Sequence, residues 1–213
     1  MAQSFNAITP ENVYSPFVKT IQADKVWQKN LQGQNIRVAV IDSGINPMQD
    51  LYALDGRYRV VMETAFNGDS NRTPFDGYGH GSHIAGIIGG NGSYLNSKYA
   101  GVAPQVDIVN VKVSNDNGGA RISSVVAGMD WVLKNKDALN IRVVNISING
   151  TEYTSYHKDA LSAAAEVLWF NKIVVVASAG NNADGKLYAP ANDPFVITVG
   201  AVDDMGTATV ADD

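Results

Sequence analysis

The sequence predicts an α/β fold, a mostly parallel twisted sheet with helices on both faces. Short apolar runs rich in Val and Ile alternate along the chain with stretches whose apolar residues recur at helical spacing. Each run ends at a turn signal, which is typical of strands that are buried on both faces. Strands separated by helical stretches form βαβ units with right-handed crossovers. The sequence shows no internal repeat and no domain boundary.

The expected elements can be given in chain order. Residues 17–31 carry a helical pattern, and the first strand follows at 36–41. The other expected strands are 59–62, 106–113, 141–148, 173–179 and 195–202, and the other expected helices are 80–88, 123–134 and 157–170. A long glycine-rich loop over 67–81 separates the second strand from its helix, and such loops are usually functional. Residues 1–16, polar and interrupted by two prolines, are expected to be an arm or a linker remnant.

Composition narrows the classes of protein. The chain has 213 residues, 45% apolar and 17% charged, which indicates a soluble globular domain. The net charge is −5 and no basic block occurs, so we expect no nucleic-acid partner. The absence of cysteine excludes disulfides, thiolate catalysis and Cys-ligated zinc. No signal peptide is visible at the start, and no apolar run approaches the ~20 residues of a membrane span, so we expect no membrane partner.

One carboxylate stands in an unusual place. Residues 38–44 read VAVIDSG, so an apolar strand ends abruptly on Asp42. Strand packing gives no reason for an acid there, whereas ligands and chemistry gather beyond the carboxyl ends of parallel strands. We therefore take Asp42 as a candidate site residue. The alternative is that Asp42 is a helix cap or a turn former.

Further polar residues follow the ends of other expected strands. Ser147 and Asn149 follow one strand, and Asn181 follows the next. Because parallel strands share a carboxyl edge, these residues and Asp42 are expected to line one rim. His80 enters at the start of the helix that follows the glycine-rich loop. A carboxylate beside such a histidine fixes its tautomer, and a side-chain amide on a rigid rim can donate to an oxyanion.

Each of these residues also has a structural interpretation. A lone histidine in a glycine loop can be a hydrogen-bonded structural residue. Asn181 after glycine can be a left-handed turn residue, and Asn149 with Gly150 forms a normal turn pair. His80 and His83 have the spacing of half a metal site, but no third ligand lies at metal spacing. The conjunction of the signals favours a site.

Together these motifs resemble those of the subtilisin-like serine peptidases, the subtilases. Residues 38–44 are similar to the family's aspartate motif, and residues 79–86 (GHGSHIAG) are similar to its histidine motif. Residues 174–181 resemble the strand that leads to the oxyanion-hole asparagine, and residues 144–147 resemble the start of the specificity-pocket wall. The resemblance implies the three-layer subtilisin-like architecture. It also implies a serine-type endopeptidase that hydrolyses peptide bonds through an acyl-enzyme.

The resemblance implies a role for each matching residue. Asp42 orients the imidazole of His80, His80 is the general base and acid, and Asn181 holds the oxyanion. The implied pocket residues are Ser147, Ile148, Asn149, Ser178, Ala179 and Gly180. The implied edge for an extended polypeptide substrate is Gly118, Gly119 and Ala120, a β-augmentation contact. The family also implies an extracellular location.

Two departures from the family pattern matter. Asn149 stands where the family usually has glycine, so its side chain either narrows the pocket or points away if Gly150 takes over the turn. The family's third motif, a Gly-Thr-Ser segment that opens a helix, is absent, and no serine of these 213 residues has that context. We therefore expect residues 17–213 to be an incomplete peptidase domain, inactive alone. A pro-segment or a missing C-terminal part of the same protein would be its partner.

Other functions are weighed against this one. A catalytically dead peptide-binding module is the main alternative, although a binder has no need of Asp42, His80 and Asn181 in register. A nucleotide-binding domain is disfavoured because no G-x-G-x-x-G or Walker pattern follows the first strand. The chemistry requires no cofactor. Asp50 occupies a position where the family often has a calcium ligand, but residues 89–99 do not resemble the usual calcium loop, so a metal is left open.

Overall fold

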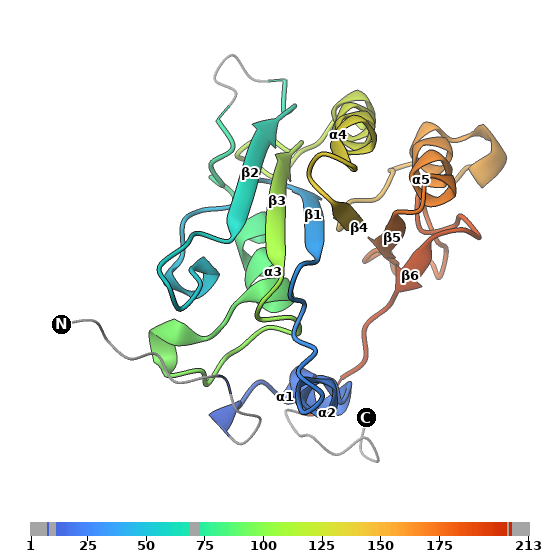
Figure 1. Ribbon diagram of the computed structural model, residues 1–213. Coiled ribbons are helices and arrows are strands. Elements are labelled where there is room, and N and C mark those ends of the chain that lie inside the picture. Colours follow the sequence, from blue (N-terminus) through green and yellow to red (C-terminus); the bar gives the residue numbers. More distant parts are fainter. Residues whose placement is uncertain (1–7, 9–11, 69–72, 204, 206–213) are drawn as a thin grey trace.

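The computed structural model describes residues 8, 12–68, 73–203 and 205, and it contains a six-stranded sheet. The strands are β1 (Arg37–Asp42), β2 (Val60–Ala65), β3 (Asp107–Lys112), β4 (Ile141–Ile146), β5 (Val174–Ser178) and β6 (Ile197–Val199). Their order across the sheet is β2-β3-β1-β4-β5-β6, and every neighbouring pair is parallel (Figure 1). The predicted α/β fold with a parallel sheet is confirmed.

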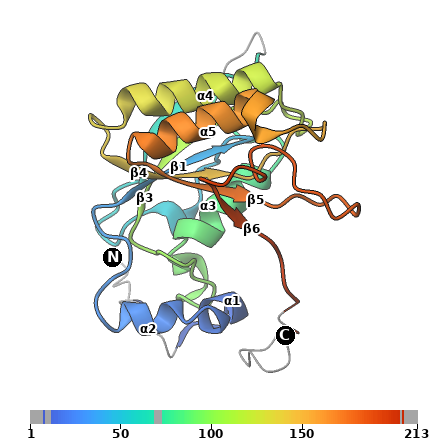
Figure 2. The same ribbon diagram turned by 90° about the vertical axis from the view of Figure 1, so that its right-hand side faces the viewer.

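Helices cover both faces of this sheet. Helices α4 (Ile122–Asn135) and α5 (Ala160–Phe170) lie side by side on one face, and α3 (His80–Gly89) lies on the other (Figure 2). The remaining helices are short: α1 (Pro16–Thr20), α2 (Ala23–Trp27), and the 3₁₀ turns η2 (Gln49–Leu51), η3 (Ser93–Leu95) and η4 (Tyr156–Lys158). The fold therefore has three layers, as the family resemblance implies.

The alternation of side chains along β1 explains the two layers of core. Ala39 and Ile41 belong to the apolar cluster shared with α4 and α5. Val38 and Val40 belong to a second cluster that includes Ala85 of α3. Because successive side chains of a strand point to opposite faces, a strand buried on both faces needs an unbroken apolar run. By the same alternation, Asp42 points to the α3 side.

The connections place the carboxyl ends of β1 and β4 at a switch point. The chain leaves β1 toward β2 and β3 on one side, and it leaves β4 through α5 toward β5 on the other. Ligand crevices in open α/β sheets form where outgoing connections diverge in this way. The register puts Ile41 opposite Ile146, and Ile146 opposite Ala177. The residues that follow these three strands therefore emerge at one rim.

Some predicted element bounds were wrong. The helix expected over 17–31 is two short helices, because the chain turns at Gln22, whose φ is +60°. Only residues 8 and 12–16 of the expected arm are described, and Val13 and Ser15 are buried there. Hydrogen bonds from Tyr14 N to Lys98 O and from Ser15 Oγ to Ala100 O tie this part of the arm to the fold. β2 begins one residue late and runs on to residue 65, and β4 and β6 are shorter than expected. Among the described residues, none of the helices has the length and apolarity needed to cross a bilayer.

Candidate active site

Asp42 and His80 meet at the end of β1. His80 Nδ1 lies 2.8 Å from Asp42 Oδ1, and the same oxygen accepts a hydrogen bond from Ser43 N at 2.7 Å. The Asp42 side chain is 3% exposed and the His80 side chain is 42% exposed. A carboxylate only accepts hydrogen bonds, so Nδ1 carries a proton, and in the neutral imidazole Nε2 keeps its lone pair. The imidazole is therefore held on its buried side and open on its other side.

The first turn of α3 is capped by side chains from outside the helix. Gly79, the residue before the helix, has φ +94°, and no side chain of its own can cap the turn. Gly81 N donates to Ser43 Oγ at 2.9 Å, and Ser82 N donates to Asp76 Oδ2 at 2.8 Å. The first amides of a helix have no partner within it, and these two bonds satisfy two of them.

Gly81 is required by the closeness of β1 to α3. A Cβ at this position would collide with the carbonyl oxygen of Gly44, and it would lie 3.1 Å from Asp42 Cβ. Any larger residue would push the start of α3 away from the end of β1. The absence of a side chain at Gly81 therefore allows the 2.8 Å contact between Asp42 and His80.

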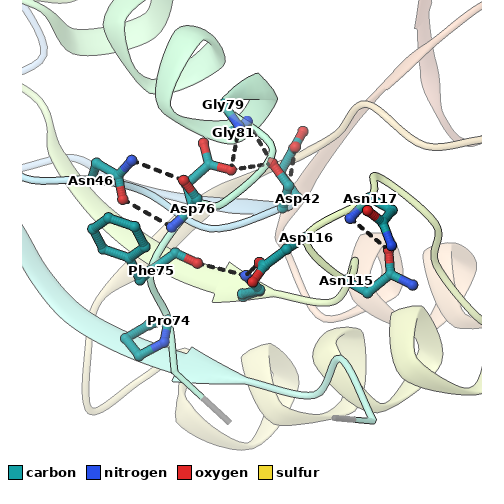
Figure 3. A network of polar contacts seen from close by, with 12 residues as sticks. Asp42, Asn46, Pro74, Phe75, Asp76, Gly79, Gly81, Asn115, Asp116 and Asn117 are labelled. Atoms are coloured by element: carbon teal, nitrogen blue, oxygen red, sulfur yellow. Dashed lines mark hydrogen bonds and ion pairs between the residues drawn. The ribbon is translucent and has the colours of Figure 1, made fainter. Parts of the chain in front are cut away.

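Asp76 is a second buried carboxylate beside this pair. Its Oδ1 accepts from Ser43 Oγ at 2.8 Å and from Gly79 N at 2.7 Å. Burial alone would raise the pKa of Asp76, but hydrogen bonds from Ser82, Gly79 and Ser43 outweigh it and hold the pKa below its ordinary value. Asp76 therefore remains ionised at the amino end of α3, where the helix dipole favours negative charge. Figure 3 shows Asp76 between Asn46 and the start of α3.

Residues 74–76, the strap segment, are held by their carbonyl groups. These three carbonyls accept in turn from Asn110 Nδ2 at 3.0 Å, Lys112 Nζ at 2.5 Å and Asn46 Nδ2 at 2.9 Å. Figure 3 shows the strap segment and the contacts between Asn46 and Asp76. The Lys112 side chain is 1% exposed and forms an ion pair with Asp116. Three consecutive carbonyls thus have side-chain donors from β3 and from the turn after β1, which fixes the backbone that carries Asp76.

The residues expected to form the specificity pocket lie beyond β4 and β5. Residues 147–150 and 178–180 are half-buried. Asn149 Nδ2 donates to Ser178 O at 2.9 Å, and Ser178 Oγ donates to Asn149 Oδ1 at 3.0 Å. A Cβ on Gly180 would lie 3.3 Å from Asn149 Oδ1. The Asn149 side chain therefore lies between the two segments and does not point away from them.

Asn181 differs from the pair at β1. It lies three residues beyond β5, its side chain is exposed, and it has no hydrogen-bond partner among the described residues. Gly180, just before it, has φ +92°, so glycine is needed for that turn. The sheet places Asn181 beyond β5, which is separated from β1 by β4, at the same carboxyl edge as Asp42.

The segment expected to pair with a substrate, residues 118–120, lies against Tyr78, whose ring is near that of His80. A Cβ on Gly118 would lie 2.7 Å from the Tyr78 ring, so this ring packs directly on the Gly118 backbone. The Tyr78 and His80 ring centroids are 6.5 Å apart, and Tyr78 is 56% exposed. Gly119 and Ala120 are exposed, and Ala120 bridges back to Ser114 in antiparallel fashion.

Several site residues were missed by the sequence reasoning. Asp76 lies in the long loop, where no periodicity marks an acid four positions before His80. Lys112 and Asn110 left a signal that could have been used: they interrupt an apolar strand at alternate positions and therefore share one face. Tyr78 had no signal beyond its place before His80.

The sequence left a metal site open at His83 and Asp50. His83 is exposed, and no group of three His, Cys, Asp or Glu side chains suited to a metal occurs among the described residues. Asp50 Oδ1 accepts from Tyr94 N at 2.7 Å and from Ser93 Oγ at 3.3 Å. The Asp50 carboxylate is thus used to hold the 91–94 turn.

The geometry defines a class of protein. A buried carboxylate that holds Nδ1 of a half-exposed histidine at the carboxyl edge of a parallel sheet is similar to the acid–histidine pair of hydrolases that activate a hydroxyl nucleophile. Residues 33–212 match the model of the subtilase family, and the chain belongs to that family.

Named relatives support this membership. The chain is 34% identical to the minor extracellular protease Epr of Bacillus subtilis over 92% of its own length and 28% of that protein. It is 34% identical to subtilisin DY of Bacillus licheniformis over 87% of its length and 63% of that protein. It is 31% identical to the major intracellular serine protease of Bacillus subtilis over 87% of its length and 56% of that protein. The chain thus spans less than two thirds of each of these relatives.

Proposed function

We propose that this chain carries the acid–base half of a serine endopeptidase active site. Asp42 orients His80 and stabilises the imidazolium, and His80 takes a proton from a serine and returns it to the leaving amine. The observation that carries the proposal is the 2.8 Å contact between Asp42 Oδ1 and His80 Nδ1, which leaves Nε2 free on the open side. The names of the relatives, all proteases, support the same reaction.

The oxyanion donor in this proposal is Asn181. Its amide is exposed at the carboxyl edge and has no partner among the described residues, so it is free to donate to a developing oxyanion. Removal of such a donor is expected to lower kcat about 10²–10³-fold, which is the magnitude established for subtilisin itself.

The substrate in this proposal is a polypeptide bound in extended form. Gly118, Gly119 and Ala120 would pair with its backbone, beside the exposed ring of Tyr78. The side chain that precedes the scissile bond would enter between residues 147–149 and 178–180. Because Asn149 bonds to Ser178 across that space, we propose a pocket narrower than one that has glycine at position 149.

The serine in this proposal lies outside the 213 residues. The serines of the aspartate and histidine motifs, Ser43 and Ser82, are engaged with Asp76 and Asn46 and are buried. The chain alone is therefore proposed to be inactive. An extracellular location is proposed from relatives such as Epr, although an intracellular protease is among the relatives as well.

A fluorophosphonate probe tests the proposal. The reading frame is continued past the codon for Asp213, and the longer product is compared with the 213-residue chain. The longer product should be labelled at a serine and should cleave peptides, and the shorter chain should not be labelled. Asp42→Asn should lower kcat by about 10⁴-fold, because the acid no longer holds the required tautomer.

The result that overturns the proposal is equally specific. If the longer product is folded, contains no reactive serine and binds extended peptides without cleavage, the chain is part of a peptide-binding module. If Asp42→Asn leaves the labelling rate unchanged, the Asp42–His80 pair does not serve catalysis.

A further inference from the structure

The contacts of Asp76 connect the two motifs that supply Asp42 and His80. On the β1 side, Asp76 Oδ1 accepts from the hydroxyl of Ser43, the residue that follows Asp42. On the α3 side, its two oxygens accept from Gly79 N, just before His80, and from Ser82 N, two residues after it. One carboxylate is therefore bound both to the end of β1 and to the first turn of α3.

The direction of each hydrogen bond requires a carboxylate at this position. Gly81 N donates to Ser43 Oγ, so the hydroxyl proton of Ser43 is available for Asp76. Asp76 Oδ1 then faces two donors, and Oδ2 faces the Ser82 amide. An asparagine would turn an NH₂ group toward a donor in either orientation of its amide, whereas a carboxylate accepts on both oxygens.

Asp76 is itself fixed in place. It is 3% exposed, and Asn46 holds its backbone at both polar atoms, with Asp76 N donating to Asn46 Oδ1 and Asn46 Nδ2 donating to Asp76 O, each at 2.9 Å. The two preceding residues of the strap segment, Pro74 and Phe75, are anchored by Asn110 and Lys112. Asp76 therefore fixes the start of α3 relative to the sheet.

We propose that Asp76 is the positioning residue of the Asp42–His80 pair: through Ser43, Gly79 and Ser82 it fixes the imidazole so that Nδ1 donates to Asp42. This inference rests on the proposed function for its biological meaning. The positioning itself is a property of the folded chain, and it can be measured without any peptidase activity.

The test observes the tautomer of His80 in the 213-residue chain. Imidazole nitrogens are recorded by ¹⁵N NMR at about pH 8, where a histidine of ordinary pKa is neutral. We expect His80 to have its proton on Nδ1 and to show a downfield Nδ1–H resonance, with His83 and His157 as internal references. Asp42→Ala is the positive control, because it removes the acceptor of that proton.

Asp76→Asn should abolish the downfield Nδ1–H resonance and move the proton of His80 toward Nε2. Asp159→Asn is the matched control at another helix. Asp159 caps α5 and accepts from the same kinds of donor as Asp76, two backbone amides and one side-chain hydroxyl. These are Leu161 N, Ser162 N and Thr154 Oγ1. Its replacement should weaken the fold at a comparable cap but leave the His80 signals unchanged.

A second variant covers the case in which Asp76→Asn does not fold, as judged by circular dichroism. Ser43→Ala keeps Asp76 and its bonds to α3 but removes the link from Asp76 to β1 and the acceptor of Gly81 N, and it should also lose the Nδ1–H resonance. Retention of the wild-type His80 signals in a folded Asp76→Asn chain, or in Ser43→Ala, would overturn the proposal. An equal change in Asp159→Asn would overturn it as well, because the effect would then be a general loss of stability. If the Nδ1–H signal behaves as expected but the longer product is not a peptidase, only the proposed function fails.

Discussion

The two sides of the candidate site are held in very different ways. The β1–α3 corner comprises Asp42, Ser43, Asp76 and the first turn of α3. It is densely hydrogen-bonded, and all three of these residues are buried, as are Gly81 and Ser82 in the helix turn. The β4–β5 corner comprises residues 147–150 and 178–181, which are half-buried to exposed. Its two segments are joined by the two hydrogen bonds between Asn149 and Ser178. The difference indicates that the histidine and its acid are preorganised within this chain. The oxyanion and pocket side depends on fewer described contacts.

The largest expected effect comes from adding a methyl group inside the crowded β1–α3 corner. Gly81→Ala places a methyl group against the Gly44 carbonyl and Asp42, and should cost about 1–3 kcal/mol or more of unfolding free energy. Urea denaturation measures the loss. Gly86→Ala on the same helix is the control, because a Cβ there has nothing within 4 Å and should stabilise by about 0.5–1 kcal/mol. Equal stability of the two variants would show that α3 can move away from β1 at little cost.

The second prediction compares the response to acid of Asp76, in the β1–α3 corner, with that of Asp193, a buried carboxylate outside both corners. The pKa of Asp76 is lowered by its hydrogen bonds despite the opposing effect of burial, so the stability that it contributes is present above the ordinary carboxyl pKa and is lost as the pH falls below it. Burial raises the pKa of Asp193, which lies just before β6, with Glu166 adding to the rise. Its charge therefore destabilises the fold at neutral pH, and that cost disappears as the pH falls through the raised pKa.

Urea midpoints between about pH 3 and pH 7, a span that brackets the ordinary carboxyl pKa, measure this comparison. Asp76→Asn should lose more stability at the upper end than at the lower end. The stability of Asp193→Asn relative to the wild type should be highest at the upper end, because the substitution removes a buried charge. One oxygen of that carboxylate has no hydrogen-bond partner among the described residues. Parallel pH profiles for the two variants would contradict the assigned directions.

A smaller effect is expected from the contact across the β4–β5 corner. Asn149→Ala removes two hydrogen bonds to Ser178 and should cost about 1–2 kcal/mol by urea denaturation. In the longer product, Asn149→Gly should also raise kcat/KM for substrates with a large residue before the scissile bond, relative to small ones. An unchanged preference would show that Asn149 does not narrow the pocket.

The smallest effect on stability is expected at Asn181. Its side chain is exposed and has no described partner, so Asn181→Ala should change the unfolding free energy by less than about 0.5 kcal/mol. The same variant in the longer product should lower kcat without a matching change in stability. A large loss of stability would mean that Asn181 is held by the fold, as the residues of the β1–α3 corner are.

The sequence alone was sufficient for the fold class and for the residues at the strand ends. Apolar runs such as residues 38–41 are local signals, and a run buried on both faces requires helices on both sides. The positions of Asp42, Asn149 and Asn181 followed from where those runs stop. Element ends were less well predicted, as at Gln22, because a left-handed residue that breaks a helix leaves little trace in the apolar pattern.

Only the tertiary structure showed what holds the site together. Asp76 and Ser43 are 33 positions apart, and Gly81 and Ser43 are 38 apart, so no local pattern indicates that they form hydrogen bonds. The need for glycine at position 81 is likewise set by the approach of a distant backbone. Periodicity records which side chains face the core. The partners of a buried carboxylate and of the first amides of a helix depend on which loops the folded sheet brings together.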